Sequence, residues 1–260
     1  MSIHYETLPL ATLYPEAFDV PPPAPPLERS LRARRTGVFI RRVGGDSETL
    51  DLAELAAEPV PVPVPATDVE GGADPAPVAR ELVTGQWGLV PPWVKSASDA
   101  KLRSPKLVNA RSETVTTSNN FRDAWLKGQR CIVPIMAFFE DDWRNVKGSG
   151  KPVPTRISRV DGKPMGVAGL WERWAGHGED EGQTLISYTL LTVNANSHAL
   201  LHRYQPPGSE KRMPVILNEG AYSAWLNARP EKAREFMRAY AANWLTANPV
   251  ETKADKRPMG

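Results

Sequence analysis

Three groups of polar residues interrupt apolar segments and mark the places where this sequence could carry chemistry. The first is the run 109–114 (Asn-Ala-Arg-Ser-Glu-Thr), the second is Glu140 directly after the apolar residues 137–139, and the third is the run 202–213. A carboxylate that ends an apolar strand is costly to bury without a partner. Glu140 is therefore either turned to solvent or part of a site, and the residues alone leave both alternatives open.

Two basic segments indicate contact with nucleic acid. Residues 29–42 contain six arginines, Arg34 and Arg35 among them, and no acid, while residues 95–130 contain eight Lys or Arg against three acids. Such segments with Trp and Phe between them suit phosphate contact and base stacking, although a solvated protein face has the same composition. The net charge of +2 hides this uneven distribution.

No metal or cofactor motif is present in the sequence. Glycine-rich phosphate loops, His-Glu-x-x-His and Cys-x-x-Cys are all missing. His198 and His202 are four residues apart and could share a helix face, but a zinc site needs further ligands that the sequence does not place. We therefore expect no bound metal and no cofactor.

Composition excludes several classes of protein. The 260 residues include 26 prolines, 19 glycines and one cysteine, which rules out a collagen, a coiled coil and a disulfide scaffold. No apolar run approaches the length of a membrane span, and the first ten residues lack the pattern of a signal peptide. The lone Cys131 fits a reducing compartment, so we expect a cytoplasmic, nucleoid-associated protein without membrane contact.

The order of short apolar segments predicts the fold class. Strands are expected at 37–40, 81–90, 130–133, 137–139, 155–158, 166–171, 187–193 and 213–217, with helices at 121–127, 219–227 and 230–244. Asp161-Gly162 is expected to form a hairpin turn between two of the strands. Many short strands, few helices and no alternation of strand and helix predict a single barrel-like α+β domain of mainly antiparallel strands.

Prolines are concentrated in the N-terminal third of the chain. Eleven of the 26 lie between residues 20 and 80, which predicts surface loops or linkers, with a docking segment for a partner as the alternative. We place one domain over 1–245 with a proline-rich insert around 56–78, followed by a flexible tail at 246–260.

Six motifs in order carry a resemblance to a known family. They are Trp87-Gly-Leu-Val-Pro-Pro-Trp93, the run 109–114, 130–134 (Arg-Cys-Ile-Val-Pro), 138–140 (Phe-Phe-Glu), 166–171 (Gly-Val-Ala-Gly-Leu-Trp) and 211–217 (Lys-Arg-Met-Pro-Val-Ile-Leu). The sequence resembles the SOS response-associated peptidase (SRAP) family, the abasic-site processing proteins. The resemblance implies a barrel-like α+β domain that acts in the DNA damage response and binds single-stranded or junction DNA at an abasic site.

The resemblance also implies a covalent reaction at the N-terminus. In the family, removal of the initiator methionine exposes a cysteine whose amine and thiol capture the sugar aldehyde as a thiazolidine. By position, Glu140 then moves protons during imine formation, and Asn109 holds the sugar or the N-terminus. The resemblance implies DNA contacts at Trp87, Trp93, Arg111 and Arg212. We add the basic residues Arg34, Arg35 and Lys211 as further candidates for DNA binding. For the two tryptophans, packing in the core is an equal alternative.

The sequence departs from the family at two positions of the reaction. Ser2 stands where the family has its cysteine; a serine amine still forms an imine, but closure by the hydroxyl gives an oxazolidine that hydrolyses more easily. The family's histidine, an acid or base near the sugar oxygen, has two candidate positions here, His202 and Gln205. If Gln205 occupies the site, the acid–base role is lost.

Three classes of function stay open at this stage. The first is an abasic-site crosslinking enzyme that uses Ser2, Asn109, Glu140 and His202, with a peptidase label that fits self-removal of Met1. The second is a module that binds damaged or single-stranded DNA without covalent chemistry. The third is an N-terminal serine hydrolase with Ser2 as nucleophile and its own amine as base.

Overall fold

The computed structural model describes residues 4–44, 78–144 and 150–250. Ser2 and residues 56–77 of the proline-rich insert lie outside the described residues. Within the described ranges, no helix is long and apolar enough to cross a membrane.

Five strands close into a barrel because β10 pairs with a neighbour on each of its edges. The ring runs β3 (Thr36–Arg42), β4 (Arg80–Trp87), β10 (Thr184–Asn194), β9 (Met165–Ala175) and β6 (Arg130–Ile135), and β6 returns to β3. All of these pairs are antiparallel except β10–β4. Three short strands extend the sheet: β5 (Asn109–Arg111), β11 (Arg212–Pro214) and β12 (Ile216–Leu217). The predicted fold class, a barrel-like α+β domain of mainly antiparallel strands, is confirmed.

A second sheet contains the first described strand of the chain together with strands from its middle and its end. Its order is β13 (Leu245–Pro249), β8 (Val153–Arg159), β7 (Ala137–Asp142), β1 (His4–Glu6) and β2 (Ser30–Arg32). Every pair in it is antiparallel. β7 therefore lies between β1 and β8, and Glu140 on β7 faces Thr155 of β8 in the register.

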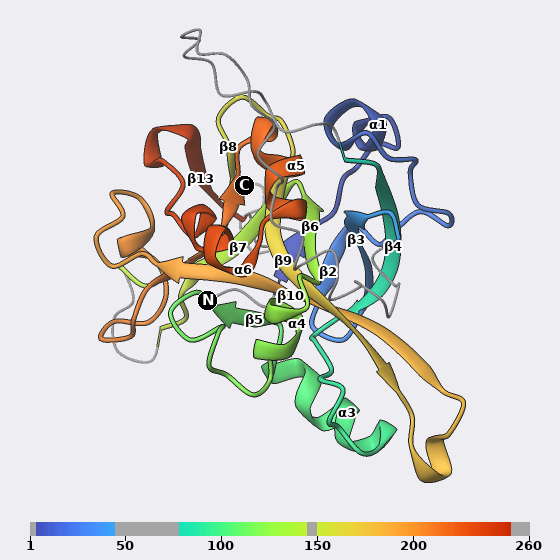
Figure 1. Ribbon diagram of the computed structural model, residues 1–260. Coiled ribbons are helices and arrows are strands. Elements are labelled where there is room, and N and C mark those ends of the chain that lie inside the picture. The colour runs from blue at the N-terminus through green and yellow to red at the C-terminus, as the bar shows by residue number, and fades with distance from the viewer. Residues whose placement is uncertain (1–3, 45–77, 145–149, 251–260) are drawn as a thin grey trace, which may run out of the picture.

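Short helices cover the ends and outer faces of the sheets (Figure 1). They are α1 (Leu13–Phe18), α3 (Ala97–Arg103), α4 (Arg122–Leu126), α5 (Tyr222–Asn227) and α6 (Pro230–Ala233), with 3-10 turns at Ser104–Lys106, Gly178–Asp180, Leu201–Arg203, Glu219–Ala221, Arg234–Phe236 and Ala242–Trp244. The main core is aromatic at its centre, where Phe39, Trp87 and Tyr188 are fully buried.

A smaller apolar cluster supports the far end of the β9–β10 hairpin, which projects beyond the barrel next to α3 (Figure 1). The cluster consists of Val90, Val94, Ala100 and Trp174. The indole of Trp174 donates to the carbonyl of Val94 at 2.6 Å, and the Asp180 carboxylate accepts from the first helical amide of α3, Ala97 N–H, at 2.8 Å. The hairpin tip thus fixes the start of α3.

Three sequence predictions of local structure are wrong. The turn at Asp161-Gly162 does not join a hairpin, because β8 and β9 belong to different sheets. The helix predicted at 230–244 ends at Ala233, and the carbonyl of Tyr240 accepts from His198 Nε2 at 2.7 Å instead of from a helical amide. The single strand at 213–217 divides at Val215, whose amide donates to Leu191 and whose carbonyl accepts from Ala168.

The end of the domain also differs from its predicted position. Residues 246–249 were expected in a flexible tail, yet they form β13, which is paired with β8 from Leu245 opposite Arg159 to Pro249 opposite Thr155. The sequence Leu-Thr-Ala-Asn-Pro has no apolar run, so only its partner strand identifies it as a strand.

Candidate active site and nucleic-acid interface

Glu140 is a buried carboxylate near the centre of the second sheet. Its side chain is 5% exposed, and it makes contacts with its surroundings. The residue before it, Phe139, stacks on His4 of β1 with ring centroids 4.0 Å apart. Of the two sequence alternatives for Glu140, solvent exposure is excluded by this burial.

β1 is fixed firmly beside β7. Tyr5 lies opposite Phe138, and its hydroxyl is 2.5 Å from the hydroxyl of the buried Tyr188 in the barrel. Burial raises the pKa of the Tyr5 hydroxyl well above its usual value, so this pair is neutral. Glu6 is buried too and accepts from Arg156 Nε at 2.6 Å and from Arg29 Nε at 3.2 Å. The strand nearest the chain's N-terminus is thereby held against the strand that carries Glu140.

Gln205 connects β7 to β11. Its backbone has a φ of 68°, its N–H donates to the carbonyl of Asp141 at 2.9 Å, and the residue is 3% exposed. Its side-chain amide donates to the Arg212 carbonyl at 2.7 Å and accepts from the Arg212 N–H at 3.2 Å. Both ends of the amide are therefore used to hold β11 in place.

His202 lies one turn before Gln205 and is exposed. Its Nδ1 lies 2.7 Å from the carbonyl of His198, and because a carbonyl only accepts, Nδ1 is the donor in this contact. Of the two candidates for the family's histidine position, the structure thus places Gln205 in contact with β7 and His202 at the surface. The catalytic role predicted for His202 stays a prediction.

Asn109 lies on the barrel rather than on the sheet of Glu140. It is the first residue of β5 and pairs with Leu190 of β10. The side chain is half-buried and has contacts within the protein. Its predicted role in holding the sugar or the N-terminus stays a prediction.

Arg111 and Arg212 share an acidic partner. Glu210 accepts from Arg212 Nη1 at 2.7 Å and lies 2.8 Å from Arg111 Nη1. Arg212 is 5% exposed and also donates to both carboxylate oxygens of Glu113, at 3.0 and 2.8 Å. Arg111, at 59% exposed, is the member that faces solvent. Arg212 is therefore a buried ion-pair partner in this structure, and Arg111 is the arginine whose side chain is open to solvent.

The remaining basic residues predicted to bind DNA lie at two further places. Lys211 is half-buried, and its ammonium donates to the carbonyls of Gln205 and Pro206. Arg34 and Arg35 are exposed in the turn between β2 and β3, and the amide of Arg34 donates to the carbonyl of Trp87 at 2.7 Å. The DNA contacts of these three residues stay predictions.

The two tryptophans of the first motif have opposite environments. Trp87 is fully buried, and its indole N–H donates to the carbonyl of Val108 at 3.0 Å. A side chain at this position cannot stack on a nucleobase, so its prediction as a DNA contact is wrong and the core alternative holds. Trp93 is 41% exposed, and the guanidinium of Arg103 lies 4.9 Å from the centre of its ring.

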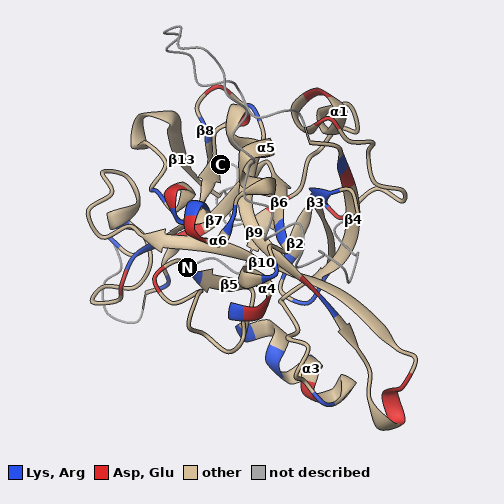
Figure 2. Ribbon diagram, viewed as in Figure 1, with Lys and Arg blue, Asp and Glu red and all other residues tan. Residues whose placement is uncertain are grey.

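Trp93 belongs to a basic and apolar surface around α3, which we call the α3 surface. Leu102 is 74% exposed on it, and a shallow hollow of about 390 Å³ nearby is lined by Asp99, Leu102, Arg103, Lys106, Leu107 and Asn120. Figure 2 shows basic segments on α3 and an acidic tip on the neighbouring hairpin. α3 was not predicted, although Ser96 caps it by accepting from the Asp99 N–H, and a Ser three residues before an acid is a known start signal.

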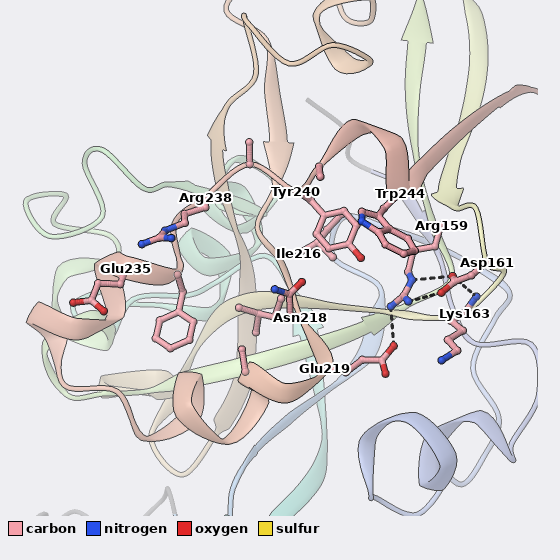
Figure 3. A pocket seen from close by; sticks show the side chains of 15 residues that line it. Arg159, Asp161, Lys163, Ile216, Asn218, Glu219, Glu235, Arg238, Tyr240 and Trp244 are labelled. Atoms are coloured by element: carbon pink, nitrogen blue, oxygen red, sulfur yellow. Dashed lines mark hydrogen bonds and ion pairs between the residues drawn. The ribbon is translucent and has the colours of Figure 1, made fainter. Parts of the chain in front are cut away.

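A second hollow, larger than the one beside α3, contains none of the predicted site residues. It has a volume of about 830 Å³ and lies at the end of β8 remote from Thr155 (Figure 3). Its wall contains the ion-paired Arg159, with Asp161 at 2.5 Å and Glu219 at 2.9 Å, and the aromatic rings of Tyr240 and Trp244. Neither Glu140 nor the arginines above reach it, so size alone does not identify the site.

In the part of the chain that the structure describes, no group of three His, Cys, Asp or Glu side chains is arranged so that it could hold a metal ion. His198 Nδ1 accepts from the amides of Leu200 and Leu201, and its Nε2 bonds to Tyr240. Both ring nitrogens are thus used in holding the local chain.

Comparisons with known proteins agree on one family. The model of the family described as SOS response associated peptidase (SRAP) matches residues 56–256. The abasic site processing protein YoaM of Bacillus subtilis is 32% identical over 170 residues, which cover 64% of this chain and 67% of YoaM. The abasic site processing protein HMCES of Gallus gallus is 28% identical over 192 residues, and the match spans 66% of this chain but 53% of that protein.

Two solved structures resemble this protein in fold. A crystal structure of a protein from Bordetella bronchiseptica is 36% identical and superposes with a TM-score of 0.75, over 97% of this chain and all of the other. A second protein, from Bacteroides thetaiotaomicron, is 26% identical with a TM-score of 0.59 over 68% of this chain and 72% of the other.

Proposed function

The chain belongs to the SOS response associated peptidase (SRAP) family, and from this membership we propose that it processes abasic sites in DNA. In this proposal the protein binds single-stranded or junction DNA and captures the aldehyde of the ring-opened sugar through the α-amine of Ser2, after Met1 has been removed. Its place is the DNA damage response.

The observation that carries the proposal is the pairing of β1 with β7. β1 begins at His4, two residues after Ser2 in the sequence. The imidazole ring of His4 is stacked on Phe139, the residue that precedes the buried Glu140. A buried carboxylate next to the strand that leads to an amine is the arrangement that imine formation needs, because the amine must lose protons and the sugar must lose water.

The chemistry follows from the groups present. An α-amine has a pKa of about 8, so a useful fraction is neutral and nucleophilic near pH 7. Its attack on the aldehyde carbon gives a carbinolamine; loss of water from that intermediate leaves a C=N bond, and Glu140 supplies and accepts the protons. The hydroxyl of Ser2 can then add to the imine carbon and close an oxazolidine, which reopens more readily than the thiazolidine of a cysteine.

The DNA strand has two surfaces to follow. Arg111 at the rim of β5 offers an exposed guanidinium for a phosphate, and the α3 surface offers an exposed indole at Trp93 with Arg103 beside it. Base stacking on an aromatic ring together with phosphate contacts is the usual mode of binding to single strands.

The test is a crosslinking assay with purified protein whose intact mass shows that Met1 is absent. Single-stranded DNA with one abasic site is incubated with the protein, with or without borohydride, and separated on denaturing gels. We expect an adduct that is trapped by borohydride and largely lost on heating without it. The Ser2→Cys variant is expected to give a heat-stable adduct without reductant.

Two controls and one outcome decide between the alternatives. An oligonucleotide without the abasic site must give no adduct, and a protein that retains Met1 must give none with the abasic strand. Absence of any trapped adduct from both wild type and Ser2→Cys, with DNA binding retained, would overturn covalent capture and leave a non-covalent binding module.

A further inference from the structure

We propose that Glu210 is an affinity-setting residue: its carboxylate occupies an anion cradle formed by Arg111, Arg212 and Asn194, and a DNA phosphate must compete with it for Arg111. The proposal rests on the proposed function, since it takes the ligand to be the phosphate backbone of a single strand. It adds Glu210, a residue that opposes DNA binding, to the residues that favour DNA binding.

The cradle is built from three nitrogen donors on three strands. Oε1 of Glu210 accepts from Arg212 Nη1 at 2.7 Å and from Asn194 Nδ2 at 3.0 Å, while Oε2 lies 2.8 Å from Arg111 Nη1. The donors come from β11, from the end of β10 and from the end of β5. Two guanidiniums and an amide converging on one point are donors suited to a phosphate as well as to a carboxylate.

The solvent exposure of these side chains shows which of them a ligand can reach. The side chains of Arg111 and Glu210 are 59% and 32% exposed, whereas that of Arg212 is 5% exposed. A phosphate in solvent can therefore reach Arg111 but not the buried guanidinium. The hydrogen bonds of Arg212 to Thr192, at 2.7 Å to the carbonyl, anchor it further.

The charges show why Glu210 is not needed to neutralise the buried arginine. Glu113 already meets Arg212 with both carboxylate oxygens, at 3.0 and 2.8 Å, and so matches its charge. Glu210 then cancels the charge of Arg111, and the four side chains sum to zero. Removal of the Glu210 charge leaves Arg111 as one uncompensated positive charge at the surface.

An uncompensated arginine changes DNA binding in a measurable way. A phosphate no longer has to displace a carboxylate or approach a negative charge. One additional phosphate neutralised on a single strand steepens the dependence of log K on log salt by about 0.7.

The experiment measures equilibrium binding of an undamaged single-stranded oligonucleotide by fluorescence anisotropy at several salt concentrations. We expect Glu210→Gln to bind roughly 3- to 10-fold more tightly than wild type, with the steeper salt dependence given above. Glu210→Ala, which removes the carboxylate without adding an amide, is expected to change affinity in the same direction. In an Arg111→Gln background the gain from Glu210→Gln should disappear.

Glu16→Gln is the matched control, because it removes an exposed acid on α1, an element that carries none of the residues proposed to contact DNA. Equal or weaker binding by both Glu210 variants, or a gain that persists without Arg111, would overturn the inference. A gain of the same size in Glu16→Gln would also overturn it, since any lost acid would then suffice. Thermal melts confirm that each variant is folded.

The undamaged strand keeps this test separate from aldehyde capture. Binding by wild type without a gain in the Glu210 variants refutes the role of Glu210 and leaves the proposed function standing. No binding of the single strand by any variant refutes the DNA contact on which both proposals depend.

Discussion

The imidazole of His4 lies flat on the ring of Phe139, with centroids 4.0 Å apart and ring planes 9° from parallel. These two residues are 135 positions apart in the chain, and their stack is the point where β1 meets the residue preceding Glu140. His4 Nε2 also lies 2.5 Å from the hydroxyl of Ser30 on β2, so the ring bridges the strands on either side of its own. The stack therefore fixes the start of β1 against β7.

Replacing His4 with Ala should slow aldehyde capture more than it weakens DNA binding. The change removes the stack that orients β1, and a misplacement of about 1 Å can cost on the order of 100-fold in rate. We expect single-turnover adduct formation to fall roughly 10- to 100-fold, while affinity for an undamaged strand changes little. His4→Phe, which keeps a flat ring on Phe139, should recover most of the rate; a variant as slow as His4→Ala would contradict the role of stacking.

Replacing Glu140 with Gln should remove proton transfer and leave the fold intact. The amide has nearly the same shape as the carboxylate but no basic oxygen, and loss of general acid–base catalysis typically costs about 100- to 10,000-fold. We expect the rate of borohydride-trapped adduct formation to fall within that range with DNA affinity unchanged.

The neighbouring Asp141 provides the control for Glu140. Asp141 is exposed, whereas Glu140 is 5% exposed. Asp141→Asn should therefore leave the rate close to wild type. An unchanged rate in Glu140→Gln, or equal losses in the two variants, would show that the buried carboxylate has no specific part in capture.

The sequence predicts the strands of this domain better than it predicts their partners. The apolar segments at 130–133, 155–158 and 187–193 all lie inside strands, because burial of alternate or consecutive apolar side chains is a local property. Pairing is not local: Asp161-Gly162 makes a turn with a Gly162 φ of 72°, but the strands on either side of it join different sheets. The closure of the barrel through both edges of β10 is likewise set by tertiary packing.

The site shows the same division between local and tertiary information. The position of Glu140 after an apolar strand left two alternatives open, a carboxylate turned to solvent or a residue of a site, and only the fold shows that it is buried. Trp87 and Trp93 lie at the two ends of one proline-containing motif, and the sequence does not distinguish them. Only the fold shows that the indole of Trp87 is in the core and that of Trp93 is exposed. Glu210 carried no signal of its own, since its partners Arg111 and Asn194 are brought to it by β5 and β10.

Replacing each of the two tryptophans with Ala should give opposite phenotypes. Trp93→Ala removes an exposed ring, so we expect a folded protein with single-strand affinity reduced by about 1–3 kcal/mol, if one base stacks there. Trp87→Ala empties a fully buried position and should lower the free energy of unfolding by about 3–5 kcal/mol. Urea denaturation and anisotropy titrations measure the two effects. Normal DNA affinity in Trp93→Ala would remove the α3 surface from the binding path.

Acidification should expose the contribution of Glu210 to stability. Hydrogen bonds from Arg212 and then from Asn194 hold the pKa of the Glu210 carboxyl below its ordinary value of 4.5. The unfolded chain therefore takes up the proton at a higher pH than the folded one does, and the stabilisation is complete above about pH 5 and decreases as the pH falls through the folded pKa. The difference in unfolding free energy between wild type and Glu210→Gln should thus be largest at neutral pH and shrink towards about pH 3.

Urea denaturation of both proteins across this pH range tests the expectation, with 1 M salt as a second condition. Because Glu210 and Arg111 are partly exposed, added salt should also reduce the difference at neutral pH. A difference that is constant from pH 7 to 3 would mean that Glu210 contributes packing rather than charge. Combined with tighter DNA binding, a less stable Glu210→Gln protein would show that this carboxylate both stabilises the free protein and opposes DNA binding.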